Sequence, residues 1–270
     1  MEIIKLAKES NEIQRVVTLK ENRNKRHKFQ EFVIEGHAAI DQACKMGWEI
    51  KAFFYNRDKD LSKWAQDHLD QKRCKVAYAL TSAMMDIISD KMEASELIAI
   101  VKSCVEPFEW FKPKANSVVV VFDEPKSPGN LGMLIRSMVA FGVSALVISG
   151  RAADEFDPVC IRASVGTFFS LPIYRVEGIA KFMETVNQIK QTKNVKIVAT
   201  GDKGSTPLQE ATFDSEVLFL IVGNETTGVS MGYKDAADQF VQIPLPGPFT
   251  SLNVAAAGSV FLYEIFKQRS

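Results

Sequence analysis

The chain has 270 residues, of which 46% are hydrophobic and 24% charged, as is typical of a folded protein with a substantial core and room for two domains. Lys and Arg together number 33, as do Asp and Glu, so no overall positive charge indicates a nucleic-acid partner, although a local basic patch could still bind one. The four cysteines form no CxxC pair, which argues against a zinc site and favours reduced thiols. Without a long apolar run or a secretory h-region, the chain is expected to be cytoplasmic and to have no membrane partner.

The first hundred residues predict a compact α/β domain. Apolar residues at helical spacing predict helix on either side of a polar break in residues 2–20, and Thr81 or Ser82 is expected to cap a later helix. The remaining elements expected here are strands at 32–36, 50–56 and from 76, and a helix at 37–47 that Gly47 ends.

The sequence pattern changes after the aperiodic stretch EPFEWFKPKANS. We interpret this stretch as a linker at residues 107–116 between domains 1–106 and 117–270. Continuous apolar runs then recur, as expected for parallel strands that are buried on both faces: SVVVVF, SALVISG, VKIVAT and VLFLIVG. Helical or loop segments separate them, which predicts an open parallel sheet covered by helices. Ligands bind such sheets outside the carboxyl ends of the strands.

The residues after the first of these strands, DEPKSPGNLGMLIRSMVAFGV, predict a turn followed by a helix. Asn130 is in a position to cap that helix, and Arg136 lies off its apolar stripe. Taken alone, Arg136 would be an ordinary surface arginine. The segment is neither a GxGxxG turn nor a P-loop, which argues against a dinucleotide-binding enzyme.

Small residues follow two further strands. Gly223 and Glu225 come after VLFLIV, and Thr200 and Gly201 end VKIVAT. Glycine allows the backbone to approach a ligand closely, although an exposed loop carboxylate and a plain turn would explain the same residues.

The stretch IPLPGPFTSLNVAAAG places a proline-rich loop directly before an apolar helix. Ser251 is a natural N-cap, and Asn253 could simply face solvent. Capping does not explain the three prolines, whereas a rigid loop can present its backbone groups to a flat ligand at little entropic cost.

Together, SPGNLGMLIRSMVAFGV, LFLIVGNETTGVS and VQIPLPGPFTSLNVAAAG resemble, in order and spacing, the three motifs of the SpoU (TrmH-type) family of SPOUT RNA methyltransferases. The resemblance covers residues 117–270. FVIEGHAAIDQACKMG resembles the start of the small ribosomal-protein-like RNA-binding domain that precedes it in many members.

The resemblance implies a deep trefoil knot, S-adenosylmethionine as methyl donor, and a homodimer that completes the active site through the C-terminal domain. It implies cofactor contacts from residues in the second and third motifs and in the strand before them: Gly223, Ile243, Leu252, Thr200 and Gly201. Because the cysteines are widely spaced, no metal ion is expected in the site.

The implied reaction is methyl transfer to a ribose 2′-hydroxyl in rRNA or tRNA. All three histidines lie in the N-terminal part, so no histidine of the second domain can act as the base. Arg136 is expected to hold a phosphate and stabilise the developing alkoxide, with Asn130 orienting it or the ribose. The resemblance completes the hydrogen-bonded site with Glu225, Ser251 and Asn253.

This chain departs from the family pattern at Ser127, in NETTG, and at Pro248 and Thr250, which leaves the substrate side of the site open. RNA contact is predicted in the basic segment LKENRNKRHK, at Arg23, Lys25 and Arg26, although such runs are often only solvated. The alternative function is a catalytically silent RNA-binding protein that retains the knotted fold.

Overall fold

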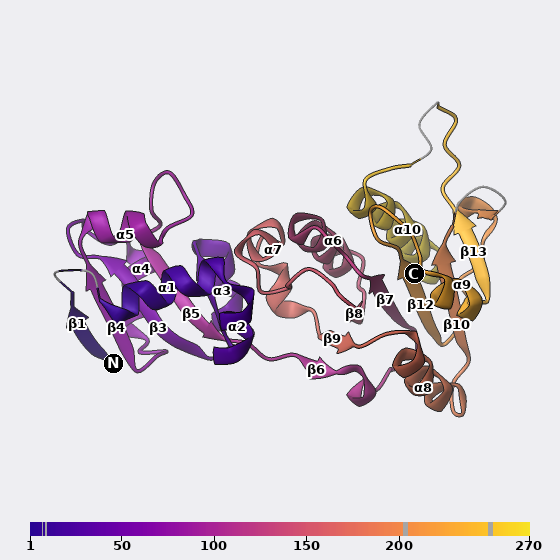
Figure 1. Ribbon diagram of the computed structural model, residues 1–270, viewed down its shortest axis with the longest axis horizontal. Helices are drawn as coiled ribbons and strands as arrows, with labels where there is room; N and C mark the ends of the chain where they lie inside the picture. The colour runs from indigo at the N-terminus through magenta and orange to yellow at the C-terminus, as the bar shows by residue number, and fades with distance from the viewer. Residues whose placement is uncertain (7, 9, 202–204, 248–250) are drawn as a thin grey trace. The chain divides into compact units, whose positions relative to one another are not determined.

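The computed structural model describes residues 1–6, 8, 10–201, 205–247 and 251–270, so Pro248 and Thr250 lie outside the described residues. The chain divides into two compact units, coloured along the chain in Figure 1. One unit contains Met1–Cys104 together with Asp154–Ser170, and the other contains Val105–Ala153 with Leu171–Ser270. The segment Asp154–Ser170, which the sequence assigned to the second domain, therefore packs with the first.

The first unit contains a sheet whose strands run, among the described residues, in the order β1 (Glu2–Lys5), β4 (Val76–Leu80), β3 (Ile50–Asn56), β5 (Leu97–Lys102) and β2 (Glu31–Glu35). β5 is antiparallel to both of its neighbours. The helices of this unit are α1 (Asn11–Glu21), α2 (Arg23–Phe29), α3 (His37–Lys45), α4 (Lys63–Asp70), α5 (Ser82–Ile88) and α7 (Pro158–Ala163).

The predicted helix near the N-terminus is wrong for its first residues. Glu2–Lys5 form a strand because they pair in parallel with β4 along its free edge. A tertiary pairing of this kind overrides the helical spacing of a few apolar residues. The strand predicted from residue 50 to residue 56 is confirmed.

Phenylalanines of the segment Asp154–Ser170 pack this segment against the rest of the first unit. Phe32 packs against Phe156, Phe168 and Phe169, with ring centroids 4.7, 6.1 and 6.3 Å away. The Trp48 indole donates a hydrogen bond of 3.0 Å to the Phe169 carbonyl. The segment thus supplies part of the hydrophobic core of this unit.

The second unit contains a sheet in which every pairing is parallel, as predicted. Within the described residues its order is β11 (Thr206–Pro207), β13 (Gln239–Gln242), β10 (Val195–Thr200), β12 (Val217–Val222), β7 (Ser117–Asp123), β8 (Ala145–Ser149), β9 (Ile173–Val176) and β6 (Glu106–Pro107). The four apolar runs are β7, β8, β10 and β12, and all residues of β7 and β12 are buried.

Helices cover this sheet. Val119 and Val121 of β7 pack with Phe182 of α8 (Ile179–Lys190) and Tyr233 of α9 (Met231–Ala236) in one core cluster. Val120 points to the opposite face and is equally buried, as expected from the alternation of side chains along a strand. The remaining helices, α6 (Pro128–Ala140) and α10 (Val254–Arg269), pack against each other.

The stretch interpreted as a linker belongs to the second unit. It forms a short helical turn, η1 (Phe108–Trp110), after β6. Phe108 and Phe111 are buried in the core beside Phe182, so this stretch is packed rather than loose.

No helix among the described residues is long and apolar enough to cross a membrane.

Candidate active site

The candidate site lies where the strand order of the second unit reverses. β7 and β12 are neighbours, but the chain continues from β7 outward to β8 and β9, whereas β10 and β13 lie beyond β12. Such a reversal leaves a crevice at the carboxyl ends of the strands, where open α/β sheets bind ligands.

A cavity of about 660 Å³ lies at these strand ends. Its lining includes nine of the ten residues that the sequence assigned to catalysis and cofactor binding: Asn130, Thr200, Gly201, Gly223, Glu225, Ile243, Ser251, Leu252 and Asn253. Residues separated by more than a hundred positions are therefore brought together. Their chemical roles stay predictions.

Three of these side chains form one hydrogen-bonded row. The Asn130 amide nitrogen donates to Glu225 Oε1 at 3.0 Å, and the Asn253 amide nitrogen donates to Asn130 Oδ1 at 3.0 Å. Glu225 also accepts hydrogen bonds from the backbone N–H groups of Lys126 and Ser127, at 3.1 and 3.2 Å. The carboxylate thereby joins the loop after β12 to the start of α6.

The two helix caps differ from those expected. Ser127, not Asn130, caps α6 by accepting a hydrogen bond from the Asn130 backbone N–H at 3.3 Å. Asn253, not Ser251, caps α10, because its Oδ1 accepts from the N–H groups of Ala255 and Ala256. This frees the Asn130 side chain for Glu225, and the cap fixes the Asn253 side chain against Asn130.

The loop after β12 has little freedom. The Asn224 carboxamide oxygen accepts from the N–H groups of Thr226 and Thr227, at 2.7 and 3.0 Å. A Cβ at Gly223 would lie 2.3 Å from the backbone of Gly228 and Val229. Only glycine allows this close approach, so the predicted special backbone at Gly223 has a packing reason.

The charge state of Glu225 follows from its partners. Partial burial acts to raise the pKa of this carboxyl, but hydrogen bonds from Asn130 and from the backbone N–H groups of Lys126 and Ser127 outweigh it. The net effect is a pKa below the ordinary value. Glu225 is therefore an ionised acceptor at neutral pH and a poor general base.

Arg136 is the predicted catalytic residue that is not among those lining the cavity. It is exposed on α6, six residues beyond Asn130, which corresponds to about 9 Å along a helix. Within one chain, the structure does not bring its guanidinium into the row of Asn130, Glu225 and Asn253.

The prediction that Arg26 contacts RNA is corrected, because this side chain is only 3% exposed. Its guanidinium donates to Asp154 at 2.6 Å and Asp157 at 3.3 Å, and to the carbonyls of Leu19 and Lys20. All its partners belong to the first unit, and the residue holds that unit together.

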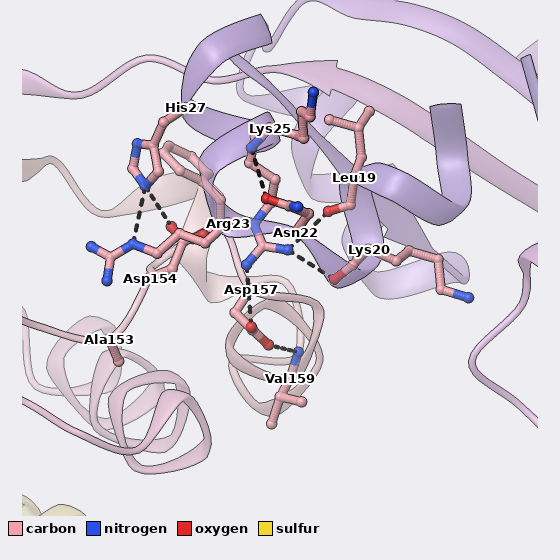
Figure 2. A network of polar contacts seen from close by, with 12 residues as sticks. Leu19, Lys20, Asn22, Arg23, Lys25, His27, Ala153, Asp154, Asp157 and Val159 are labelled. Atoms are coloured by element: carbon pink, nitrogen blue, oxygen red, sulfur yellow. Dashed lines mark hydrogen bonds and ion pairs between the residues drawn. The ribbon is translucent and has the colours of Figure 1, made fainter. Parts of the chain in front are cut away.

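The other two predicted RNA contacts lie at the surface of α2. Arg23 is exposed and donates to His27 Nε2 at 3.4 Å, as the dashed line between them in Figure 2 indicates. Lys25 is half-buried, with its ammonium 5.9 Å from the centre of the exposed Phe29 ring.

Sequence reasoning missed some of the cavity's lining, notably Leu245, Lys234 and Phe261. Lys234 lies on α9 and Phe261 on α10, where single positions carry no motif. Leu245 stands between two prolines of the loop that the sequence singled out, which was a usable signal. No cluster of His, Cys, Asp or Glu suited to a metal ion occurs among the described residues.

Comparison with known proteins identifies the family. The profile of the SpoU rRNA Methylase family matches residues 117–263, and that of the SpoU L30e-like domain matches residues 11–99. The chain belongs to the SpoU rRNA methylase family.

The chain is 33% identical over 249 residues to the 23S rRNA (uridine(2479)-2'-O)-methyltransferase of Streptomyces viridochromogenes, covering 92% of this chain and 86% of the relative. It is 29% identical over 243 residues to the 23S rRNA (guanosine(2553)-2'-O)-methyltransferase RlmP of Bacillus subtilis, covering 90% and 91%.

Solved structures of RNA methyltransferases share the fold of this chain. The SpoU methyltransferase AviRb from Streptomyces viridochromogenes, in complex with the cofactor AdoMet, superposes with a TM-score of 0.90 at 32% identity, over 97% of this chain and 98% of AviRb. The AdoMet-bound rRNA methyltransferase from Sinorhizobium meliloti gives a TM-score of 0.88 over 98% of each chain at 24% identity, which shows the shared fold.

The cavity fits S-adenosylmethionine in size and chemistry. Its volume falls within the roughly 300–1,000 Å³ of small-molecule sites. Ile243, Leu245 and Leu252 offer apolar side chains to a flat base, and Gly201 and Gly223 line the same cavity. Lys234 and Glu225 offer opposite charges to a zwitterion.

Proposed function

We propose that this protein is an S-adenosylmethionine-dependent RNA methyltransferase that modifies a ribose 2′-hydroxyl, with ribosomal RNA rather than tRNA as its substrate. The observation that carries the proposal is the row Asn130–Glu225–Asn253 at the rim of a cofactor-sized cavity. Curated relatives at 33% and 29% identity over nine-tenths of the chain are named as 23S rRNA 2′-O-methyltransferases, which supports the choice of RNA.

The cofactor would be held by the loops after β10, β12 and β13. Gly223, Ile243 and Leu252 present backbone groups and an apolar wall, and Thr200 and Gly201 close the same side. When bound, S-adenosylmethionine supplies an electrophilic methyl group on a sulfonium.

The chain's own residues then orient the acceptor. Asn130 is fixed at both ends of its carboxamide, so it and Ser251 can bind the ribose with little reorganisation. Glu225 holds Asn130 and is too weak a base to take the proton, which leaves to solvent or to a phosphate oxygen. Arg136 binds that phosphate and stabilises the developing alkoxide.

We propose a homodimer because Arg136 needs a second chain to meet a catalytic row. Large apolar side chains are 41–55% exposed on α6 and α10, namely Met133, Val260, Tyr263 and Phe266. Such a face on two adjacent helices suits a self-complementary contact. Arg136 is one helical turn from Met133, so burial of this face would carry the guanidinium into the partner.

The family's deep trefoil knot in the C-terminal domain is part of the same proposal. So is RNA binding by the N-terminal domain, predicted at residues 1–106, in which Arg23 and Lys25 lie at the surface of α2. A ribosomal RNA substrate suits a cytoplasmic protein, and the proposed reaction uses neither a metal ion nor a membrane partner.

The test of the cofactor step is calorimetric titration with S-adenosylmethionine, followed by a methyl-transfer assay on unmodified ribosomal RNA. We expect binding and transfer in the wild type, and binding without transfer in Arg136→Ala. Full turnover in Arg136→Ala would refute its role, and RNA binding without cofactor binding would favour the silent RNA-binding alternative.

A further inference from the structure

A charged group outside the catalytic row lies at the ends of β7 and β8 in the second unit. It consists of Glu124, Lys126 and Arg151, with the side chains of Lys126 and Glu124 51% and 44% exposed and Arg151 also exposed. The reaction proposed above assigns these side chains no task.

The backbone at this place is held in an uncommon conformation. Glu124 is a non-glycine residue with φ of 48°, a left-handed conformation that costs free energy and concentrates at functional sites. Gly150, with φ of 65°, lies against it, and a Cβ at this glycine would come within 2.9 Å of Glu124 Oε1. Glycine at 150 thus leaves the room that the Glu124 carboxylate occupies.

Glu124 contacts both of the other residues. Its Oε2 accepts a hydrogen bond from the Lys126 ammonium at 3.0 Å, and its Oε1 accepts from the Arg151 backbone N–H at 3.4 Å. The same ammonium donates to the Arg151 carbonyl at 3.1 Å. Lys126 meets Glu124 through its ammonium, whereas Arg151 meets it through its backbone, so this contact does not engage the Arg151 guanidinium.

This group is tied to the catalytic row by its backbone. The Lys126 N–H donates to Glu225 Oε2 at 3.1 Å, and the Asn224 amide donates to the Glu124 carbonyl at 3.2 Å. The backbone that carries Lys126 is therefore held beside the carboxylate that holds Asn130. The phosphates that flank a ribose lie one backbone step from its 2′-hydroxyl, so a ribose at Asn130 would bring a phosphate toward these cations.

We propose that Lys126 and Arg151 form a phosphate subsite for the RNA strand beside the methylated nucleotide. The inference rests on the proposed function and adds to it the place where the strand passes the catalytic row. Arg151 offers a planar guanidinium suited to bidentate phosphate binding, and Lys126 offers a point charge. Both contacts are independent of base identity, so they fix the register of the strand and not its sequence.

The test uses the full-length protein and compares wild type, Lys126→Ala, Arg151→Ala and Lys190→Ala. Both site variants keep the backbone N–H, so Glu225 keeps its donor. The control, Lys190, is exposed, ends α8 and precedes β10, at the amino edge of the sheet. Binding of a ribosomal RNA fragment is measured over a series of salt concentrations, with S-adenosylmethionine affinity and the KM for RNA measured in parallel.

We expect each site variant to bind RNA several-fold more weakly, with a log–log salt slope shallower by about 0.7–0.9, since one phosphate contact is lost. The KM for RNA should rise, cofactor affinity should be unchanged, and Lys190→Ala should match wild type. Lys126→Arg should restore binding, and Arg151→Lys should restore it only in part, because an ammonium cannot replace the bidentate guanidinium contact.

Unchanged RNA affinity and salt slope in both site variants would overturn the subsite, as would an equal loss in Lys190→Ala. Loss of cofactor affinity instead would assign these cations to the cofactor. The two proposals fail separately, because an inactive wild type refutes methyl transfer while the salt slopes still measure phosphate contact.

Discussion

At the scale of single residues, the site depends on which polar group performs which local task. Ser127 and Asn253 take the two helix caps, and this leaves the Asn130 carboxamide held between Glu225 and Asn253. An acceptor-binding group that is fixed before substrate arrives needs little reorganisation in the reaction.

Asn253→Asp tests this division of tasks. Aspartate still caps α10, but it places an acceptor where the Asn253 amide now donates to Asn130. We expect kcat to fall by about 10²–10³, similar to the loss of one preorganised donor, with little change in melting temperature. The matched control is Asn116→Asp, at an exposed residue with φ of 62°. Activity close to wild type in Asn253→Asp would show that the contact is incidental.

The lowered pKa of Glu225 predicts how stability depends on pH. A carboxyl whose pKa is lower in the folded state stabilises the protein above its unfolded pKa, near 4.3, and this contribution is lost as the pH falls through the folded value. The difference in unfolding free energy between wild type and Glu225→Gln should therefore be constant from pH 8 to about 5 and shrink below that. Urea unfolding over this range measures it, and a difference that grows in acid would reverse the assignment.

Sequence reasoning singled out nine residues of the cavity lining, because strand ends of a parallel sheet meet at one edge. It did not identify which residue caps each helix, since Ser127 and Asn130, or Ser251 and Asn253, are equally plausible caps by residue type. Nor could charge patterning distinguish the buried Arg26 from its exposed neighbour Arg23, because its partners lie 128 and 131 residues away.

At the scale of elements, the segment Asp154–Ser170 matters most for the first unit. It supplies phenylalanines to the core around Phe32 and carboxylates to Arg26 on α2. Apolar runs predicted the central strands, but nothing local indicated that this segment packs with the first unit, because its partners are distant in sequence.

Arg26→Ala should destabilise this unit strongly. Asp154 is 3% exposed, so removal of its partner leaves an uncompensated buried charge, which typically costs about 3–5 kcal/mol. Arg23→Ala, on the exposed side of the same helix, should cost far less. Urea unfolding of both variants checks this, with the double variant Arg26→Leu and Asp154→Leu expected to recover part of the loss. Equal small effects of the two single variants would contradict a structural role for Arg26.

At the scale of the whole molecule, the proposed dimer explains why Arg136 lies outside the cavity that Asn130, Glu225 and Asn253 line. Gly258 brings α10 close to Leu134 of α6, where a Cβ would lie 2.5 Å from that side chain, and Tyr263 and Phe266 remain exposed beside it. In the proposed dimer, the partner subunit would bury these apolar side chains. It would also bring its own row of Asn130, Glu225 and Asn253 to Arg136.

Tyr263→Glu combined with Phe266→Glu should convert the dimer to a monomer, because like charges would meet across a self-complementary face. Turnover should fall with the dimer while the first unit stays folded. Light scattering and a methyl-transfer assay on the same samples measure both. Lys190→Glu controls for added negative charge, and a fully active monomer would refute a shared active site.

The most direct test of the central claim is methyl transfer from labelled S-adenosylmethionine to unmodified ribosomal RNA, followed by nucleoside analysis. We predict label in a single 2′-O-methylnucleoside and none in a parallel tRNA pool. Label on a base would contradict the account. So would the absence of label when the protein binds the cofactor and is given both intact ribosomal RNA and precursor particles.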